Sequence, residues 1–143
     1  IEARIMAWHK NNAMSQRLAT IPGIGPIIAT AIAATVAEPC EFHSGREFAA
    51  WLGLVPRQNS TGGKTRLGGI SKRGDSYLRR LLVNGAHAAL LRSKAAKADP
   101  WLIALRGRRP RLVVAVALAN KTARIAWAIM TKKDSYRFAA AAA

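Results

Sequence analysis

Apolar residues recur with the period of an α-helix over most of this chain. In residues 1–19 they form a loose i, i+4, i+7 stripe, which predicts an amphipathic helix. Since the chain opens inside this pattern, we expect residues 1–20 to be the end of a longer preceding helix. A second helix is predicted for residues 26–36, because proline suits the first helical position at Pro26 and the segment stops before Pro39.

Later helices are marked by their N-terminal caps. Ser44 with Glu47 three residues on has the spacing of a capping box, and Asp75 or Ser76 suits the start of a long amphipathic helix. A short helical turn and a last helix complete the pattern, so the later helices are expected at residues 45–52, 76–92, 101–105 and 111–131.

No segment shows the alternation of a β-strand, so the expected fold class is all-α. We predict a single compact helical domain over residues 1–143, with a polar link at 93–100 and a frayed tail at 139–143. Residues 53–75 stand apart, because their glycines, proline and small polar residues cannot make a good helix. They are predicted to form a long Ser/Gly-rich basic loop, and loops of about 20 residues are usually functional or disordered.

The charge is strongly one-sided. The chain has 143 residues with 23 Lys and Arg against 7 Asp and Glu, a net charge of +16, and is 50% hydrophobic. The apolar half is enough for a core, which excludes a disordered basic tail. Residues 57–80 and 92–111 hold most of the excess, each with a single aspartate. This clustering predicts binding to a polyphosphate backbone, with an anionic membrane surface as the lesser alternative.

The sequence argues against disulfides, a metal site and a membrane-spanning segment. A single cysteine, Cys40, rules out a disulfide framework and a cysteine zinc site, and the three histidines lack metal-ligand spacing. The apolar stretches 18–37 and 112–119 are broken by Pro and Gly or too short to span a bilayer, and no signal peptide is found. We therefore expect a cytoplasmic protein that uses no membrane.

Residues 18–37 resemble the helix-hairpin-helix element of DNA-binding proteins. Gly23 and Gly25 would let backbone amides approach a phosphate, and the N-terminus of the following helix favours an anion. The alternative is a structural corner that needs glycine only for its turn. The element predicts a partner, either DNA or RNA, but no activity.

The predicted loop holds a hydroxyl, that of Ser60, among glycines and basic residues. Phosphoryl transfer to a side chain needs such a group, since the hydroxyl attacks phosphorus while guanidinium groups neutralise charge. From these residues alone, a flexible DNA-contacting loop is the favoured interpretation. Nucleotide binding is rejected, because the Gly-Gly-Lys-Thr at residues 62–65 lacks the strand and earlier glycine of a P-loop.

Five short blocks follow one another in a fixed order: IPGIG at 21–25, FAAWLGLVP at 48–56, STGG at 60–63, ISKRGD at 70–75 and LRRLL at 78–82. This order closely resembles the C-terminal transposase domain of the DEDD-type insertion-sequence transposases. That family is related to Piv-type DNA invertases and includes recombinases guided by a bridge RNA. The resemblance covers about residues 17–138.

The resemblance implies that this domain supplies a serine that becomes covalently joined to a DNA phosphate. That serine maps to Ser60, with Thr61 and Ser71 as weaker candidates. An N-terminal RuvC-like domain with four metal-binding carboxylates would complete the site. The expected DNA-binding residues are Gly23, Gly25, Arg57, Lys64, Arg66, Lys72, Arg73, Arg79 and Arg80.

The RuvC-like half has no counterpart in this sequence, whose seven carboxylates are scattered. We therefore expect no metal or cofactor to be bound by this chain, Mg²⁺ to be bound by the full-length enzyme through its other domain, and the isolated chain to be inactive. Expected partners are DNA, a guide RNA in some members, and further copies in a dimer or tetramer, on the bacterial nucleoid. The rivals are a non-catalytic helix-hairpin-helix DNA- or RNA-binding module and an RNA-binding structural protein of ribosomal type.

Overall fold

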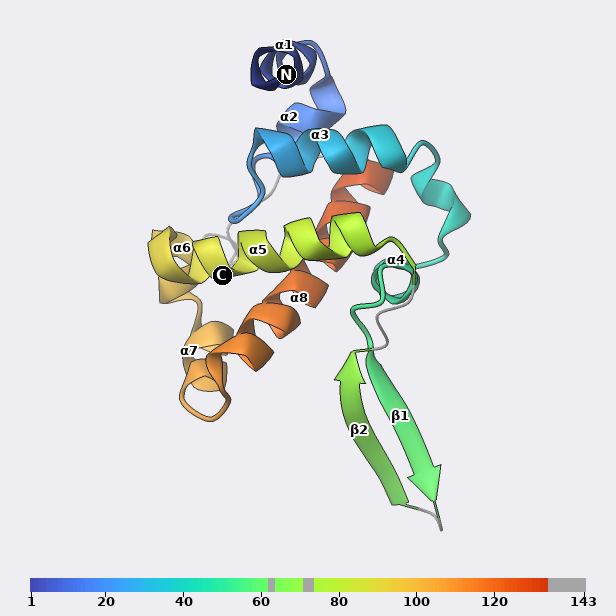
Figure 1. The fold of residues 1–143 in the computed structure, drawn as a ribbon, viewed down its shortest axis with the longest axis vertical. Helices are drawn as coiled ribbons and strands as arrows, with labels where there is room; N and C mark the ends of the chain where they lie inside the picture. The colour runs from blue at the N-terminus through green and yellow to red at the C-terminus, as the bar shows by residue number, and fades with distance from the viewer. Residues whose placement is uncertain (62–63, 71–73, 134–143) are drawn as a thin grey trace.

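The computed structural model describes residues 1–61, 64–70 and 74–133, the two strands as backbone. Figure 1 shows a body of helices from which one pair of strands projects. Along the chain the elements are α1 (Glu2–Lys10), α2 (Ala13–Leu18), α3 (Pro26–Thr35), the 3-10 turn η1 (Pro39–Glu41), α4 (Gly45–Trp51), β1 (Pro56–Thr61), β2 (Lys64–Ile70), α5 (Ser76–Arg92), α6 (Lys94–Ala98), α7 (Pro100–Arg106) and α8 (Arg111–Lys132).

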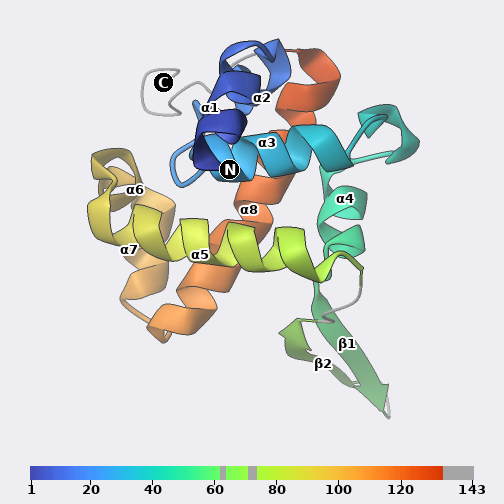
Figure 2. The ribbon, with the colours of Figure 1, turned by 45° about the horizontal axis from the view of Figure 1, so that its top comes forward.

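Helix α8 is the central element of the helical body. It crosses α5 and also packs against α4, α7 and α2 (Figures 1 and 2). Its buried side carries small residues at helical spacing, which lets the neighbouring helices approach closely. These are Ala115, Ala119, Ala123 and Ala126. Larger side chains from the other helices surround them, among them Leu18, Ile32, Phe48, Leu78 and Leu102.

The apolar length of α8 follows from this central place. By length and composition alone the helix could cross a membrane, yet 44% of its apolar window is buried inside the fold. A core helix needs apolar residues around much of its circumference, because several neighbours cover it. Packing within the protein therefore accounts for its composition.

The predicted helix starts are confirmed by their caps. The Ser44 hydroxyl accepts a hydrogen bond from the Glu47 amide at 3.2 Å, and the Asp75 carboxylate accepts one from the Leu78 amide at 2.9 Å. Pro26 occupies the first turn of α3 as expected. Each side-chain cap contributes about 1 kcal/mol to helix stability.

The single helix predicted for residues 1–19 is wrong, since the chain forms α1 and α2 with a break between them. Asn11 ends α1, and Asn12 caps α2 by accepting a hydrogen bond from the Ser15 amide at 2.8 Å. Asparagine competes with the helix for backbone hydrogen bonds, so two in succession interrupt it. In the same way, the predicted polar link at 93–100 contains the short helix α6, which Ser93 caps.

The all-α prediction is confirmed for the helical body, but the long loop predicted at 53–75 is wrong in its central part. Strands β1 and β2 form an antiparallel pair, with Ser60 opposite Thr65 and an irregularity near Pro56. The pattern was missed because both strands are polar and neither shows apolar alternation. The signal present in the sequence is the two-residue Gly62-Gly63 step, which is typical of tight hairpin connections.

Candidate nucleic-acid interface

Strands β1 and β2 form an arm that extends away from the helices (Figures 1 and 2). In the described part of the chain neither strand packs against a helix. Six strand residues at about 3.3 Å each span about 20 Å. Residues 56–61 and 64–70 are hereafter called the hairpin arm.

Ser60 lies close to the outer end of the hairpin arm. Its partner in the register is Thr65, and only the pair of Thr61 with Lys64 lies further out. Thr65 itself stands between Lys64 and Arg66 in β2. The backbone of the predicted nucleophile is therefore held away from the helical body, opposite a strand segment that carries two basic residues.

The base of the hairpin arm is tied to three helices. The Arg79 guanidinium on α5 donates a hydrogen bond to the Leu52 main-chain oxygen at 3.2 Å, beside the end of α4. The Asn120 amide in the middle of α8 donates one to the Leu54 main-chain oxygen at 3.1 Å. Leu52 and Leu54 are buried, so these bonds satisfy carbonyls that water does not reach. The arm therefore leaves the body from a fixed point.

Gly74, just before the Asp75 cap of α5, lies against the backbone of Trp51 at the end of α4. Its φ of +86° lies in the left-handed region, and a Cβ at this position would overlap the main-chain oxygen of Trp51. Only glycine fits here, both for its conformation and for the close approach of the two backbones. The glycine in the ISKRGD block thus has a structural reason.

The sequence-predicted basic residues fall into three groups. Arg57, Lys64 and Arg66 lie on the strands of the hairpin arm, while Lys72 and Arg73, with the alternative nucleophile Ser71, lie outside the described residues. Arg79 and Arg80 follow on the first turns of α5. Arg80 is exposed, whereas half-buried Arg79 is the donor to Leu52. The role of these residues as DNA ligands stays a prediction.

Gly23 and Gly25, the two glycines of the turn between α2 and α3, occupy different environments. Gly23 has a φ of +91°, and a Cβ on it would lie 2.8 Å from the main-chain oxygen of Gly85 and 3.1 Å from the Cβ of Ala89, both on α5. Gly25 is exposed at the N-cap of α3, and a Cβ on it would meet nothing within 4 Å. Packing against α5 therefore explains Gly23, and phosphate contact stays a prediction for both glycines.

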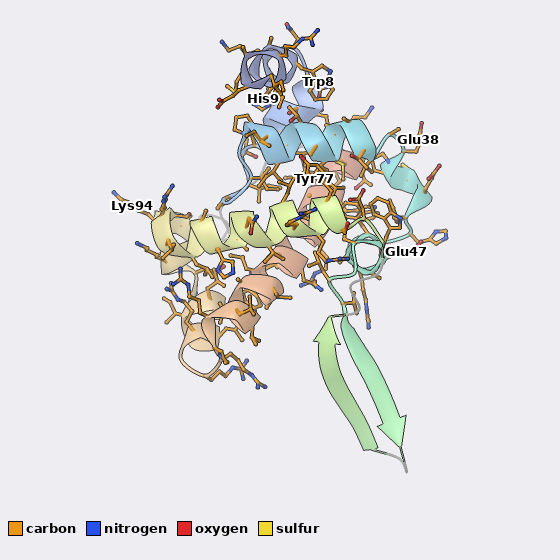
Figure 3. The ribbon with its side chains drawn as sticks, in the orientation of Figure 1. Trp8, His9, Glu38, Glu47, Tyr77 and Lys94 are labelled. Carbon is orange, nitrogen blue, oxygen red and sulfur yellow. The ribbon has the colours of Figure 1, made fainter. Side chains whose placement is uncertain are left out.

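The carboxylates are spread over the helical body. Within residues 1–61, 64–70 and 74–133, no three of the His, Cys, Asp and Glu side chains come together as a metal site would need. Asp75 and Asp99 cap helices, and Asp99 also lies 3.5 Å from the Lys121 ammonium. Figure 3 shows Glu38 and Glu47 at the outside of the body, where both are exposed.

Sequence reasoning missed Asn120 as a residue of the site. It belongs to the segment ALANKTARIAW at 117–127, but nothing local indicates that its side chain reaches a carbonyl 66 residues earlier. Three tryptophans make specific contacts, although Trp51 and Trp101 are each 38% exposed. Trp51 stacks on Phe48, Trp101 lies under the Lys121 ammonium, and Trp127 donates to the Pro39 main-chain oxygen.

The fold and the site define a class: a basic helical domain that carries a projecting, polar hairpin arm on a fixed base. The chain belongs to the family described as "Transposase IS116/IS110/IS902 family", whose profile matches residues 15–101. The match runs from within α2 to the first residues of α7 and includes the whole hairpin arm.

Several relatives extend the likeness beyond the profile. The chain is 55% identical over 140 residues to the "Probable family 20 transposase" of Pseudomonas aeruginosa. It is 45% identical over 138 residues to the "Transposase for insertion sequence element IS1111A" of Coxiella burnetii, and 46% identical over 134 residues to the "Transposase for insertion sequence element IS1328" of Yersinia enterocolitica. These alignments cover 96%, 95% and 92% of the chain but only 41%, 38% and 40% of the relatives. The chain thus spans about two fifths of their length.

Proposed function

We propose that this chain is the DNA-binding, serine-bearing part of a transposase that exchanges DNA strands. Ser60 is the nucleophile, and Arg57, Lys64 and Arg66 hold the phosphate that it attacks. The observation that carries the proposal is the hairpin arm, which brings Ser60 to the outer end of a basic projection with a fixed base. Such a projection can carry Ser60 into a DNA groove or to the metal-binding domain that completes the active site, whereas a serine buried in the helical body could reach neither.

The reaction is a transesterification. The Ser60 oxygen forms a bond to phosphorus, a deoxyribose oxygen leaves with the electron pair of the broken P–O bond, and the serine proton passes to a base. Basic side chains stabilise the charge on the phosphoryl oxygens in the transition state. The serine–DNA adduct is again a phosphodiester, because the new Ser60 O–P bond replaces the broken P–O bond, so a DNA hydroxyl can later displace the serine without an external energy source.

Serine is a weak nucleophile at neutral pH and needs activation. The described carboxylates do not fit a two-metal site, because they lie apart and two of them serve as helix caps. We therefore assign Mg²⁺ binding to a RuvC-like domain outside this chain, with the four carboxylates of a DEDD-type transposase, and expect the chain alone to be inactive. Bound there, Mg²⁺ would activate the nucleophile and stabilise the leaving oxygen.

The proposed assembly follows from the chemistry. Recombination must pair two DNA ends, which favours a dimer or tetramer of the full-length protein, and a bridge RNA is a second polyanion that the basic surface could accept. We propose a bacterial, nucleoid-bound setting, because the proposed substrate is DNA and the relatives belong to bacteria. The competing function is a helix-hairpin-helix binding module without chemistry, supported by the exposure of Gly25 at the start of α3.

The test is whether a covalent adduct forms between the protein and DNA. The full-length transposase containing this chain is incubated with Mg²⁺ and labelled DNA, and the products are separated under denaturing conditions. We expect an adduct that Ser60→Ala abolishes, while DNA affinity stays within a few-fold, since one neutral hydroxyl contributes about 1 kcal/mol. Thr61→Ala is the matched control and should keep the adduct. An adduct that survives Ser60→Ala, or maps to Thr61 or Ser71, would contradict the assignment.

A further inference from the structure

A second concentration of positive charge lies away from the hairpin arm, at the turn that joins α7 to α8. We define the arginine corner as residues 106–111, which contain Arg106, Arg108, Arg109 and Arg111. All four are exposed. The only carboxylates between residues 74 and 133 are Asp75 and Asp99, and both are already engaged as helix caps. The corner therefore carries four uncompensated charges within six residues.

The backbone of the corner is well held. The amides of Arg108 and Arg109 both donate to the Leu105 main-chain oxygen, at 3.2 and 3.0 Å, and Leu105 and Val114 are buried on either side of the turn. Arg106 is tied to the end of α5, since its guanidinium donates to the Leu90 main-chain oxygen at 3.4 Å. The side chains of Arg108, Arg109 and Arg111 have no such acceptor among the described residues. These three guanidinium groups are thus presented to an outside anion from a fixed turn.

The corner and the arm point to the same side of the molecule. In both views the α7–α8 turn and the strands extend beyond α5 in the same general direction (Figures 1 and 2). Along α8, Asn120, which anchors the arm, lies nine positions after Arg111. At 1.5 Å per residue this is about 14 Å along the axis of α8, the length of only about four base pairs at roughly 3.4 Å each. One duplex can therefore reach both features.

We propose that the arginine corner binds the phosphate backbone of duplex DNA, as a second contact separate from the hairpin arm. This rests on the proposed function only in taking DNA as the partner. Guanidinium groups match phosphate oxygens in a bidentate geometry, which explains arginine rather than lysine at all four positions. Exposed Ile103, Leu112 and Val113 flank the corner, but a second copy does not fit there because it would bring four like charges against four.

The experiment compares two triple variants of the 143-residue chain that remove equal charge. Arg108→Gln, Arg109→Gln and Arg111→Gln form the corner variant. Arg4→Gln, Lys10→Gln and Arg46→Gln form the control, whose residues are exposed on α1 and α4 and lie outside both basic segments; Figure 1 shows α1 on the opposite side of the helical body from the α7–α8 turn. Since all six side chains are exposed, both variants should keep the wild-type thermal unfolding temperature, which is measured first.

Affinity for a duplex of about 30 base pairs is then measured by fluorescence anisotropy from 50 to 200 mM salt. Each phosphate contact adds about 0.9 to the slope of log K against log salt, so the corner variant should lose up to about 2.7 from that slope and bind at least tenfold more weakly. The control should lose less than a third as much. Equal losses in both variants, or an unchanged slope in the corner variant, would overturn the proposal.

Two further titrations distinguish DNA from other partners of the corner, and a failure of this proposal from a failure of the proposed function. The same titrations use single-stranded RNA and vesicles of mixed anionic and neutral lipid. If the corner variant loses only RNA or vesicle binding while duplex binding is unchanged, the corner serves a different partner and the proposal is wrong. If the wild-type chain does not bind duplex DNA at any salt, the proposed DNA function fails together with it. Wild-type binding with an unchanged corner variant overturns the corner alone.

Discussion

The side-chain amide of Asn120, in the middle of α8, donates a hydrogen bond to the main-chain oxygen of Leu54, 3.1 Å away. Leu54 is 1% exposed and precedes the first residue of β1 by two positions. One side chain of the central core helix therefore helps to hold the point from which the hairpin arm departs, together with Arg79. It links the packing of the helical body to the placement of Ser60, although the two lie far apart in the sequence.

Replacing Asn120 by alanine should loosen the base of the arm. The Leu54 carbonyl would remain buried without this donor, so we expect a loss of about 1–3 kcal/mol in the free energy of unfolding, measured in urea. The amides near the base of the arm should also exchange faster with deuterated solvent. Asn84→Ala, at an exposed position of α5, is the control and should change neither quantity. An Asn120→Ala protein with unchanged stability and exchange would show that the bond does not hold the arm.

Gly74→Ala should be among the most damaging single substitutions in the chain. The new Cβ would overlap the Trp51 carbonyl, and alanine disfavours a φ of +86°. We expect a loss of about 3 kcal/mol or more, measured by thermal or urea unfolding. The matched control is Gly107→Ala, where φ is −72° and the nearest atom to a Cβ is 3.5 Å away. That change should be neutral or stabilising by up to about 1 kcal/mol, and equal effects at both sites would contradict the geometry.

The two glycines of the α2–α3 turn should separate folding from binding. Gly23→Ala forces a Cβ against the Gly85 carbonyl and should destabilise the chain by about 1–3 kcal/mol. Gly25→Ala has open space and a φ of −90°, so unfolding should be unchanged. If the amides of this turn bind a phosphate, Gly25→Ala should still weaken duplex binding several-fold. A stable Gly25→Ala chain with wild-type affinity would make the turn a structural corner only.

Local signals in the sequence were sufficient for most helices and for the overall class. Ser44, Asp75 and Pro26 mark helix starts by their own chemistry, and the structure places caps or first turns at each. What the sequence could not reveal depends on distant partners. The need for glycine at position 23 comes from Gly85 on α5, and the role of Asn120 comes from Leu54. Neither relationship leaves a periodic or short-range trace.

The hairpin arm was missed for a different reason. Strand prediction relies on apolar alternation, which arises when one face of a sheet covers a core. Neither β1 nor β2 packs against a helix in the described part of the chain, so no face needs apolar residues. The ordered sequence blocks single out Ser60 as the candidate nucleophile, which stays a prediction, but its place near the outer end of an arm required the register of the two strands.

The last prediction concerns the stability of the arm itself. A two-stranded hairpin without a covering layer is marginally stable in water, so the amides of β1 and β2 should exchange with solvent far faster than those of α8. Binding of duplex DNA should slow this exchange in the arm more than in the helical body, because contact orders the strands and excludes water. Mass spectrometry of peptides covering 56–70 and 111–132, with and without DNA, measures the difference.

A chain variant with Arg57→Gln, Lys64→Gln and Arg66→Gln should fold normally, since the strands support no part of the core, but should lose the DNA-dependent protection of the arm. Equal protection in this variant and the wild type would mean that DNA acts on the arm only through the rest of the molecule.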